Sequence, residues 1–346
     1  MRTADFDYEL PPGLIAQSPT QPRDDSRLIV LHRSTGTLEH CRFRDIGKYL
    51  RSGDVLVLND TRVIPARLRG HKEAGEDIPS GGGRVEVLLL HREAEGWRAL
   101  VRPGKRLGVG TRLILGEGRE GGHTITSVVV GLGKDGSRLL TFDDEAHLPE
   151  AGEVPLPPYI HTPLEDPERY QTVYARQPGS AAAPTAGLHF TPELLEELQE
   201  QGVGVVYVTL NIGLDTFQPV RESDPTHHTI HREYVQLSPE AVGALNRARQ
   251  AHGRIVAVGT TGVRVLEQGC REGVFESFHG WCGLYILPGH RFRGVDVMLT
   301  NFHLPRSTTL LLTAAFAGRE RLLSAYQEAI EQGYRFYSFG DGMLVL

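Results

Sequence analysis

Cysteine and lysine are scarce in this sequence of 346 residues, and long apolar runs are missing. The three cysteines, Cys41, Cys270 and Cys282, are far apart and form no CxxC pair, so neither a disulfide framework nor a cysteine-rich zinc site is expected. No apolar run approaches the roughly 18 residues that a membrane-spanning helix needs. The amino terminus is acidic and interrupted by prolines, unlike a signal peptide. We therefore expect a cytoplasmic protein without a membrane partner.

Short motifs of two common enzyme classes are also missing. There is no G-x-S-x-G elbow, which leaves a serine hydrolase unsupported. No HExxH is present, and HHTIH (227–231) lies beside Pro225 in a β-like context without a carboxylate or cysteine at ligand spacing. We therefore expect no metal centre.

Net charge is −6, from 43 acidic and 37 basic residues, which argues against a protein that coats nucleic acid by bulk charge. Local charge is different, because residues 62–112 carry a net charge of +5 and residues 113–153 a net charge of −5. The positive charge is concentrated in RALVRPGKRLGVGTR (98–112), which contains no acidic residue. A Pro-Gly-Lys-Arg turn suits an RNA backbone, and a solvated hairpin is the competing interpretation.

The pattern of apolar, polar and glycine residues changes twice along the chain. Between residues 63 and 153, short alternating segments are separated by glycine-rich turns, which predicts a small β-barrel or sandwich. After it, helical and strand patterns alternate, as in α/β proteins. The predicted fold is a discontinuous α/β catalytic domain, residues 1–62 plus 154–346, with a mixed or barrel-like sheet and helices. The all-β barrel domain, 63–153, is inserted into it.

Element boundaries in the α/β part follow from apolar periodicity and capping residues. Thr191 and Ser238 are each followed by proline, which marks the start of a helix. Helices are expected over 192–201, 239–253, 260–269, 307–317 and 319–332. Strands are expected over 28–32, 54–60, 203–210, 254–259, 281–287 and 334–340.

Two stretches place polar residues at or just before the start of a predicted helix. In AAPTAGLHFT (182–191), His189 precedes a helix N-terminus, where the dipole favours a neutral imidazole that exchanges protons near pH 7. A capping or core-facing histidine is the alternative. In RIVAVGTTGVRVLE (254–267), free backbone N–H groups of the turn are suited to phosphate, carboxylate or ribose oxygens, and Arg264 follows on the helix. An ordinary βα turn is the alternative there.

Two further stretches lie nearer the carboxyl terminus. Asn301, His303 and Arg306 precede an apolar helix and form a polar rim, unless they are simply solvated around a helix cap. Asp341 stands between two glycines after the predicted strand 334–340, where ligands bind in α/β sheets. A plain Asp-Gly turn is the alternative.

Nine stretches in order along nearly the whole chain resemble one family, the S-adenosylmethionine:tRNA ribosyltransferase-isomerases of queuosine biosynthesis. They are FDYELPPGLIAQSPTQPRDDSRL (6–28), LVLNDTRVIPARL (56–68), LVRPGKRL (100–107), PLPPYI (155–160), ERYQTVYA (168–175), AAPTAGLHFT (182–191), GTTGVRVLE (259–267), LTNFHLPRST (299–308) and YRFYSFGDGML (334–344). The resemblance implies a two-domain protein with an inserted β-barrel.

The resemblance also implies the reaction. S-Adenosylmethionine donates its ribosyl part to the aminomethyl group of 7-aminomethyl-7-deazaguanine at the tRNA wobble position, giving epoxyqueuosine-tRNA, adenine and methionine. A base removes a proton from the 5′ carbon beside the sulfonium, the ribose opens and adenine leaves. The amine then attacks the anomeric carbon, and epoxide closure expels methionine. S-Adenosylmethionine is a cosubstrate, no tightly bound cofactor is expected, and the protein is expected to be a monomer.

With this chemistry, residue types suggest roles. Proton transfers to and from carbon and adenine point to His189 and His303 as catalytic acids or bases, and Asp341 supplies a carboxylate for the sulfonium, amine or ribose. The residues expected to hold the cosubstrate are Thr260, Thr261, Arg264, Asn301 and Asn211. The residues expected to contact tRNA are Arg62, Arg102, Lys105 and Arg106.

Three residues depart from the family pattern, which has His at the position of Asn211, Gly at that of Asp215 and commonly Ser at that of Gly262. An amide does not titrate, so Asn211 is limited to hydrogen bonding. Two other functional classes stay open, a conventional S-adenosylmethionine-dependent RNA methyltransferase and a non-catalytic RNA-binding protein. Release of adenine separates the three.

Overall fold

The computed structural model describes residues 1–73, 82–116, 123–133, 136–213 and 219–346, so Asp215 lies outside the described residues. The chain forms two compact units. The α/β unit comprises Met1–Arg62, Pro157–Gln177 and Ala183–Leu346, and the barrel unit comprises Val63–Leu156 and Pro178–Ala182. Among the described residues, no helix is long and apolar enough to span a membrane.

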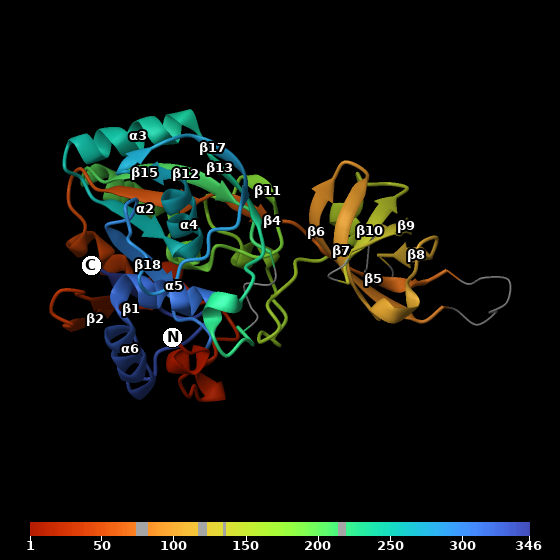
Figure 1. Ribbon diagram of the computed structural model, residues 1–346, viewed down its shortest axis with the longest axis horizontal. Coiled ribbons are helices and arrows are strands. Elements are labelled where there is room, and N and C mark those ends of the chain that lie inside the picture. Colours follow the sequence, from red (N-terminus) through yellow and green to blue (C-terminus); the bar gives the residue numbers. More distant parts are fainter. Residues whose placement is uncertain (74–81, 117–122, 134–135, 214–218) are drawn as a thin grey trace. The chain divides into compact units, whose positions relative to one another are not determined.

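A mixed sheet of nine strands is the centre of the α/β unit (Figure 1). In sheet order its strands are β17 (Phe278–Cys282), β13 (Glu233–Leu237), β12 (Gly204–Leu210), β3 (Val55–Asn59), β14 (Ile255–Val258), β18 (Val297–Asn301), β19 (Gly342–Val345), β1 (Arg27–Leu31) and β2 (Leu38–Arg42). β12, β3, β14 and β18 are mutually parallel, whereas β19 runs antiparallel to β18. The remaining short strands are β4 (Thr61–Val63), β11 (Gln177–Ser180), β15 (Cys270–Arg271) and β16 (Val274–Phe275).

The central strands are buried on both faces, as near-continuous apolar runs require. Leu56 and Leu58 of β3 point into a core with the apolar side of α2 (Pro192–Glu200), and Val57 between them points to the opposite face. On that opposite face, α4 (Gly259–Gly269) contacts β3, β12, β14 and β18. The other helices of this unit are α3 (Pro239–Gln250), α5 (Thr308–Ala317) and α6 (Arg319–Glu331).

The predicted caps are confirmed. Thr191 Oγ1 accepts a hydrogen bond from the backbone N–H of Leu194 at 3.1 Å, and Ser238 Oγ accepts one from Ala241 at 3.2 Å. Each hydroxyl satisfies a backbone donor that the first helical turn leaves without an intrahelical partner.

The barrel unit contains a closed antiparallel barrel, as the alternating segments predicted. Its strands in barrel order are β10 (Arg138–Phe142), β7 (Gly96–Arg102), β6 (Arg84–Glu93), β5 (Arg67–Lys72), β8 (Arg112–Leu115) and β9 (Ile125–Leu132), and α1 (Leu148–Ala151) follows. Alternate side chains such as Val85, Val87 and Leu89 fill the interior, so the barrel is a packed core.

Two predicted strands are wrong. The first, 281–287, is a strand only to Cys282, since β17 covers Phe278–Cys282. The second, 334–340, is a turn before β19, because Tyr337 adopts a left-handed backbone with φ of 71° and its carbonyl accepts a hydrogen bond from Gly340 N–H. Its buried aromatic side chains carry high β-propensity, and tertiary packing overrides that preference.

Candidate active site

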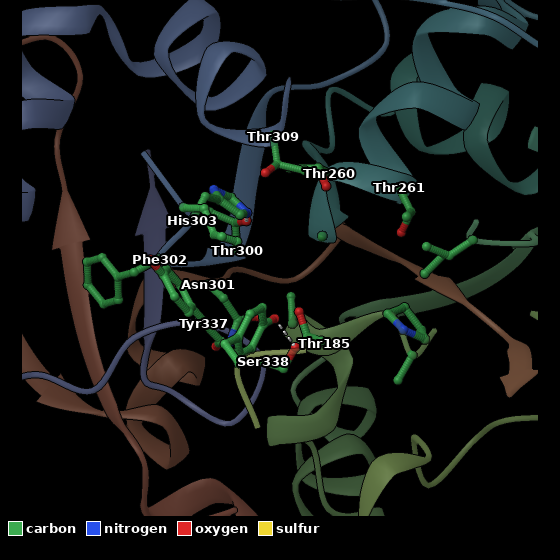
Figure 2. Close-up of a pocket in the computed structure, with 17 residues that line it drawn as sticks. Thr185, Thr260, Thr261, Thr300, Asn301, Phe302, His303, Thr309, Tyr337 and Ser338 are labelled. Carbon is green, nitrogen blue, oxygen red and sulfur yellow. Dashed lines mark hydrogen bonds between the residues drawn. The ribbon is translucent and has the colours of Figure 1, made fainter. Parts of the chain in front are cut away.

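A pocket opens at the sheet edge where β14 and β18 both end (Figure 2). Because β19 is antiparallel to β18, with Asn301 opposite Gly342, the residues just before β19 reach the same edge. The empty volume of the pocket, including space open to solvent, is about 580 Å³. Its polar lining residues are Thr185, Thr260, Thr261, Thr300, Asn301, His303, Thr309 and Ser338, and its aromatic ones are Tyr159, Phe302 and Tyr337.

His303 lines this pocket and is held on both ring nitrogens. Its Nε2 lies 3.1 Å from Thr300 Oγ1, and its Nδ1 lies 3.2 Å from Thr313 Oγ1. Thr313 already donates its hydroxyl proton to the carbonyl of Thr309, so it accepts a hydrogen bond from Nδ1–H of His303. Burial lowers the pKa of His303 to about 3, which makes it a neutral imidazole at pH 7.

Asn301 and His189 adjoin one another, but only Asn301 lines the pocket. His189 ends the 3₁₀ helix η7 (Thr185–His189) and is buried behind Asn301, with Asn301 Nδ2 at 3.3 Å from its Nε2. Burial, reinforced by the positive charges of Arg335 and Arg23, lowers the pKa of His189 to about 3. The structure therefore gives His189 a position behind the pocket wall, as the core-facing alternative anticipated.

Thr260 and Thr261 line the pocket from the first turn of α4. Gly259 precedes them with φ of 80°, a conformation that glycine adopts without strain. No side chain caps α4, and Thr261 Oγ1 is buried without a partner among the described residues. An uncapped helix N-terminus and a free hydroxyl together suit an anionic or hydroxylated part of a ligand.

Arg264, on the same helix, does not line the pocket. Its guanidinium forms a buried salt bridge with Glu233 and also donates to the carbonyls of Leu284, at 3.2 Å, and Cys282, at 3.4 Å. The guanidinium of Arg264 is therefore not free for the expected pairing with a cosubstrate carboxylate. The reason is non-local, because Glu233 comes from β13.

The carboxylate of Asp341 is also occupied by hydrogen bonds within the fold, and Asp341 does not line this pocket. Its Oδ1 accepts a hydrogen bond from the backbone N–H of Arg27 at 2.9 Å, and its Oδ2 accepts one from that of Arg335 at 2.7 Å. The carboxylate thus ties the start of β1 to the turn before β19. Asp341 lies near the expected edge because β19 begins there, not because a strand ends there.

Asn211 lies after β12 and is bonded to neighbouring residues. Its Oδ1 accepts a hydrogen bond from Thr61 Oγ1 at 2.9 Å, and its backbone N–H donates to Tyr234. The next residue, Ile212, lines the pocket, whereas Asn211 does not. Of the other departures from the family pattern, Gly262 lies in α4 and Asp215 is outside the described residues.

The four residues expected to contact tRNA are divided between the units. Arg102, Lys105 and Arg106 lie in and just before the turn η5 (Gly104–Arg106) of the barrel unit and are all exposed at its surface. Arg62 belongs to the α/β unit and forms an ion pair with Glu168.

One group of side chains in the barrel unit has the composition of a metal site. Potential ligand atoms of His123, Asp144 and His147 lie within 4.8 Å of one another. However, the two imidazoles stack with their planes 13° apart and their centres 4.1 Å apart, and Asp144 already accepts a hydrogen bond from His147 Nδ1 at 2.6 Å. Parallel stacked rings cannot both direct a lone pair in their plane at one ion. The arrangement does not fit a metal.

Several residues that line the pocket are not predicted from the sequence. Tyr337 falls within a predicted strand and Tyr159 within a proline-rich connection, while Thr185, Thr300 and Thr309 carry no distinguishing signal. The signal that could have identified Thr300 and Tyr337 is their position in the sequence. Both lie close to residues that the sequence singles out at the same sheet edge.

Comparison with known proteins gives a consistent result. The model of a family described as queuosine biosynthesis protein matches residues 3–345. The S-adenosylmethionine:tRNA ribosyltransferase-isomerases of Dehalococcoides mccartyi (strain CBDB1) and Moorella thermoacetica are 54% and 53% identical to this chain, with 100% of each chain covered. The crystal structure of an S-adenosylmethionine tRNA ribosyltransferase from Thermotoga maritima has 42% identity and a TM-score of 0.57, over 99% of this chain and 100% of that one.

Proposed function

Because the chain belongs to the family of queuosine biosynthesis proteins, we propose that the pocket at the ends of β14 and β18 holds S-adenosylmethionine while its ribosyl part is transferred to tRNA. The enzyme is an S-adenosylmethionine:tRNA ribosyltransferase-isomerase of queuosine synthesis. The acceptor is the aminomethyl group of 7-aminomethyl-7-deazaguanine at the wobble position, and the products are epoxyqueuosine-tRNA, adenine and methionine.

One observation carries the assignment of the pocket. Two of its lining oxygens, Thr261 Oγ1 and Asn301 Oδ1, are buried without a hydrogen-bond partner among the described residues. A buried polar atom without a partner costs about 1–3 kcal/mol, so a ligand that supplies hydrogen bonds is expected here. A nucleoside with hydroxyl and amino groups satisfies both.

His303 is the proposed proton-transfer residue. It lines the pocket as a neutral imidazole, so it accepts the proton from the 5′ carbon without first losing one. The imidazolium formed in this step then delivers the proton to the departing adenine. Thr300 and Thr313 hold the ring on either side.

The threonines and the start of α4 are the proposed partners of the ribose and methionine parts. Thr260 and Thr261 present hydroxyls, and the uncapped helix N-terminus suits the methionine carboxylate, a role that the Glu233 salt bridge denies to Arg264. Arg102, Lys105 and Arg106 of the inserted barrel domain are the proposed contacts to tRNA.

The test is a single incubation with precursor-modified tRNA and S-adenosylmethionine labelled in its methyl group. We expect stoichiometric free adenine and labelled methionine, with activity unchanged by EDTA. Transfer of the labelled methyl group to tRNA would instead identify a methyltransferase. Binding of tRNA without any released adenine would identify an RNA-binding protein.

A further inference from the structure

The orientation of the Asn301 amide follows from one acceptor. Asn301 Nδ2 lies 3.1 Å from the backbone carbonyl of Tyr337, and a carbonyl oxygen can only accept a hydrogen bond. The amide nitrogen must therefore face Tyr337, and the amide oxygen must face away from it. The left-handed backbone of Tyr337, with φ of 71°, belongs to the turn that carries this carbonyl.

The second proton of the same amide group fixes the state of His189. Nδ2 also lies 3.3 Å from His189 Nε2, so this ring nitrogen must present its lone pair. The ring proton then resides on Nδ1, which donates to Ser26 Oγ at 2.8 Å. Phe43 stacks on the imidazole with ring centres 4.8 Å apart, and His189 is 5% exposed. His189, held by Ser26, and Tyr337 thus fix the Asn301 amide from two sides.

The outcome is a buried acceptor without a partner, among the described residues, on a residue that lines the pocket. Asn301 Oδ1 is buried and unpartnered among the described residues, and Asn301 lines the pocket together with Tyr337 (Figure 2). Tyr159 adds a second aromatic ring at this end, with its centre 4.8 Å from that of Tyr337. Aromatic faces with an in-plane acceptor suit a purine that carries an amino group, whereas Thr260 and Thr261 lie at the other end of the pocket.

We propose that Asn301 Oδ1 accepts a hydrogen bond from the exocyclic amine of the adenine in S-adenosylmethionine, and that His189 is a positioning residue that fixes the Asn301 amide in this orientation. This rests on the proposed function of the pocket. It replaces the acid or base role expected for His189 with the selection of adenine. The 6-oxo analogue, in which hypoxanthine replaces adenine, would bring two acceptors face to face.

The experiment measures kcat/KM for S-adenosylmethionine and for its 6-oxo analogue, by release of the free base at saturating precursor tRNA. We expect the wild-type enzyme to prefer the amine by about 100-fold or more. In Asn301→Leu the preference should fall at least about tenfold, because the acceptor is gone. A ratio of two substrates on one enzyme preparation is not altered by a reduced folded fraction.

A matched pair of variants tests His189. Gln at position 189 can place an amide oxygen near the site of Nε2 and accept from Asn301, whereas Phe keeps a ring against Phe43 and offers no acceptor. We expect His189→Gln to retain the preference for adenine and a kcat within about tenfold of wild type. His189→Phe should lose most of the preference. A general acid or base at this position would instead make both variants slow, by about 100-fold or more.

Two outcomes would overturn the proposal. One is an unchanged preference for the amine in both Asn301→Leu and His189→Phe. The other is a raised KM for tRNA in Asn301→Leu with the preference intact, which would mean that Asn301 contacts the deazaguanine instead. Failure of the proposed function looks different, because the wild-type enzyme would then release no base from either compound.

Discussion

The pocket wall and the polar residues behind it differ in how their hydrogen-bonding groups are used. In the wall, Thr261 Oγ1 and Asn301 Oδ1 have no partner among the described residues. Behind it, the groups of Arg264 and Asp341 are occupied by Glu233 and by backbone N–H groups. Both layers consist of polar residues at one sheet edge. A side chain that the fold already pairs therefore supports the site, whereas an unpaired buried side chain is available to a ligand.

The largest expected effect concerns the buried ion pair between Arg264 and Glu233, which lies outside the pocket wall. Arg264→Leu leaves Glu233, whose side chain is 8% exposed, as an unpaired buried charge. We expect the free energy of unfolding to fall by about 3–5 kcal/mol in urea titrations. Adding Glu233→Gln should recover most of this loss, since the amide oxygen still accepts from Gly213 N–H. A stable Arg264→Leu enzyme with a raised KM for S-adenosylmethionine would put Arg264 in the pocket wall instead.

The next effect concerns the histidine of the wall. His303→Ala should lower the rate of adenine release by about 100-fold or more, because it removes the proposed proton carrier. Thr313→Val is the control, since it removes the hydrogen bonds of the Thr313 hydroxyl to Nδ1 and to the Thr309 carbonyl but leaves the imidazole, and we expect a decrease of no more than about tenfold. Equal decreases in the two variants, both folded by circular dichroism, would reduce His303 to a structural residue.

Acid should destabilise the protein through its buried histidines. The pKa of His189 is lowered from 6.5 to about 3, so the unfolded state binds a proton first as the pH falls below 6.5. Stability therefore decreases between pH 6.5 and about 3, with Arg335 and Arg23 opposing protonation in the folded state. At pH 5 this decrease is about 2 kcal/mol for one imidazole. Unfolding measured at pH 7 and pH 5 should show that His189→Phe reduces the difference by about this amount; an unchanged difference would contradict burial of a neutral ring.

The smallest effect per residue is expected in the barrel unit. Replacing Arg102, Lys105 and Arg106 together by Gln should raise the KM for tRNA and reduce the slope of its salt dependence by about one for each phosphate that these side chains neutralise. Arg112→Gln is the control, because Arg112 is paired with Glu73 at 2.5 Å. Identical slopes in the triple variant and the wild type would place the tRNA elsewhere.

Sequence alone predicts those features that depend on local pattern. Alternation and glycine turns reveal the barrel, and Thr191 and Ser238 mark helix starts. The start of an apolar helix singles out Asn301 and His303, but the strand β18, which places Asn301 at the sheet edge, is not predicted. Prediction stops where partners come from elsewhere in the chain. The sequence around Arg264 does not indicate that its salt-bridge partner is Glu233, which lies 31 residues away in sequence.

The turn before β19 shows a second reason. Its aromatic residues carry strand propensity, yet Tyr337 adopts a left-handed conformation that packing, and not propensity, selects. The aromatic end of the pocket therefore cannot be predicted from the local sequence pattern. The same holds for the Tyr337 carbonyl that orients Asn301.

The most direct test is to fill the pocket. Thr260→Trp places a large side chain into it from the first turn of α4, and Thr308→Trp, in the first turn of α5 and outside the pocket lining, is the matched control. The measurement is kcat/KM for S-adenosylmethionine, from adenine release at saturating precursor tRNA. We expect a decrease of at least about 100-fold in Thr260→Trp, because the cosubstrate can no longer be positioned, and near-normal turnover in Thr308→Trp. Near-normal turnover in Thr260→Trp would show that S-adenosylmethionine reacts somewhere else.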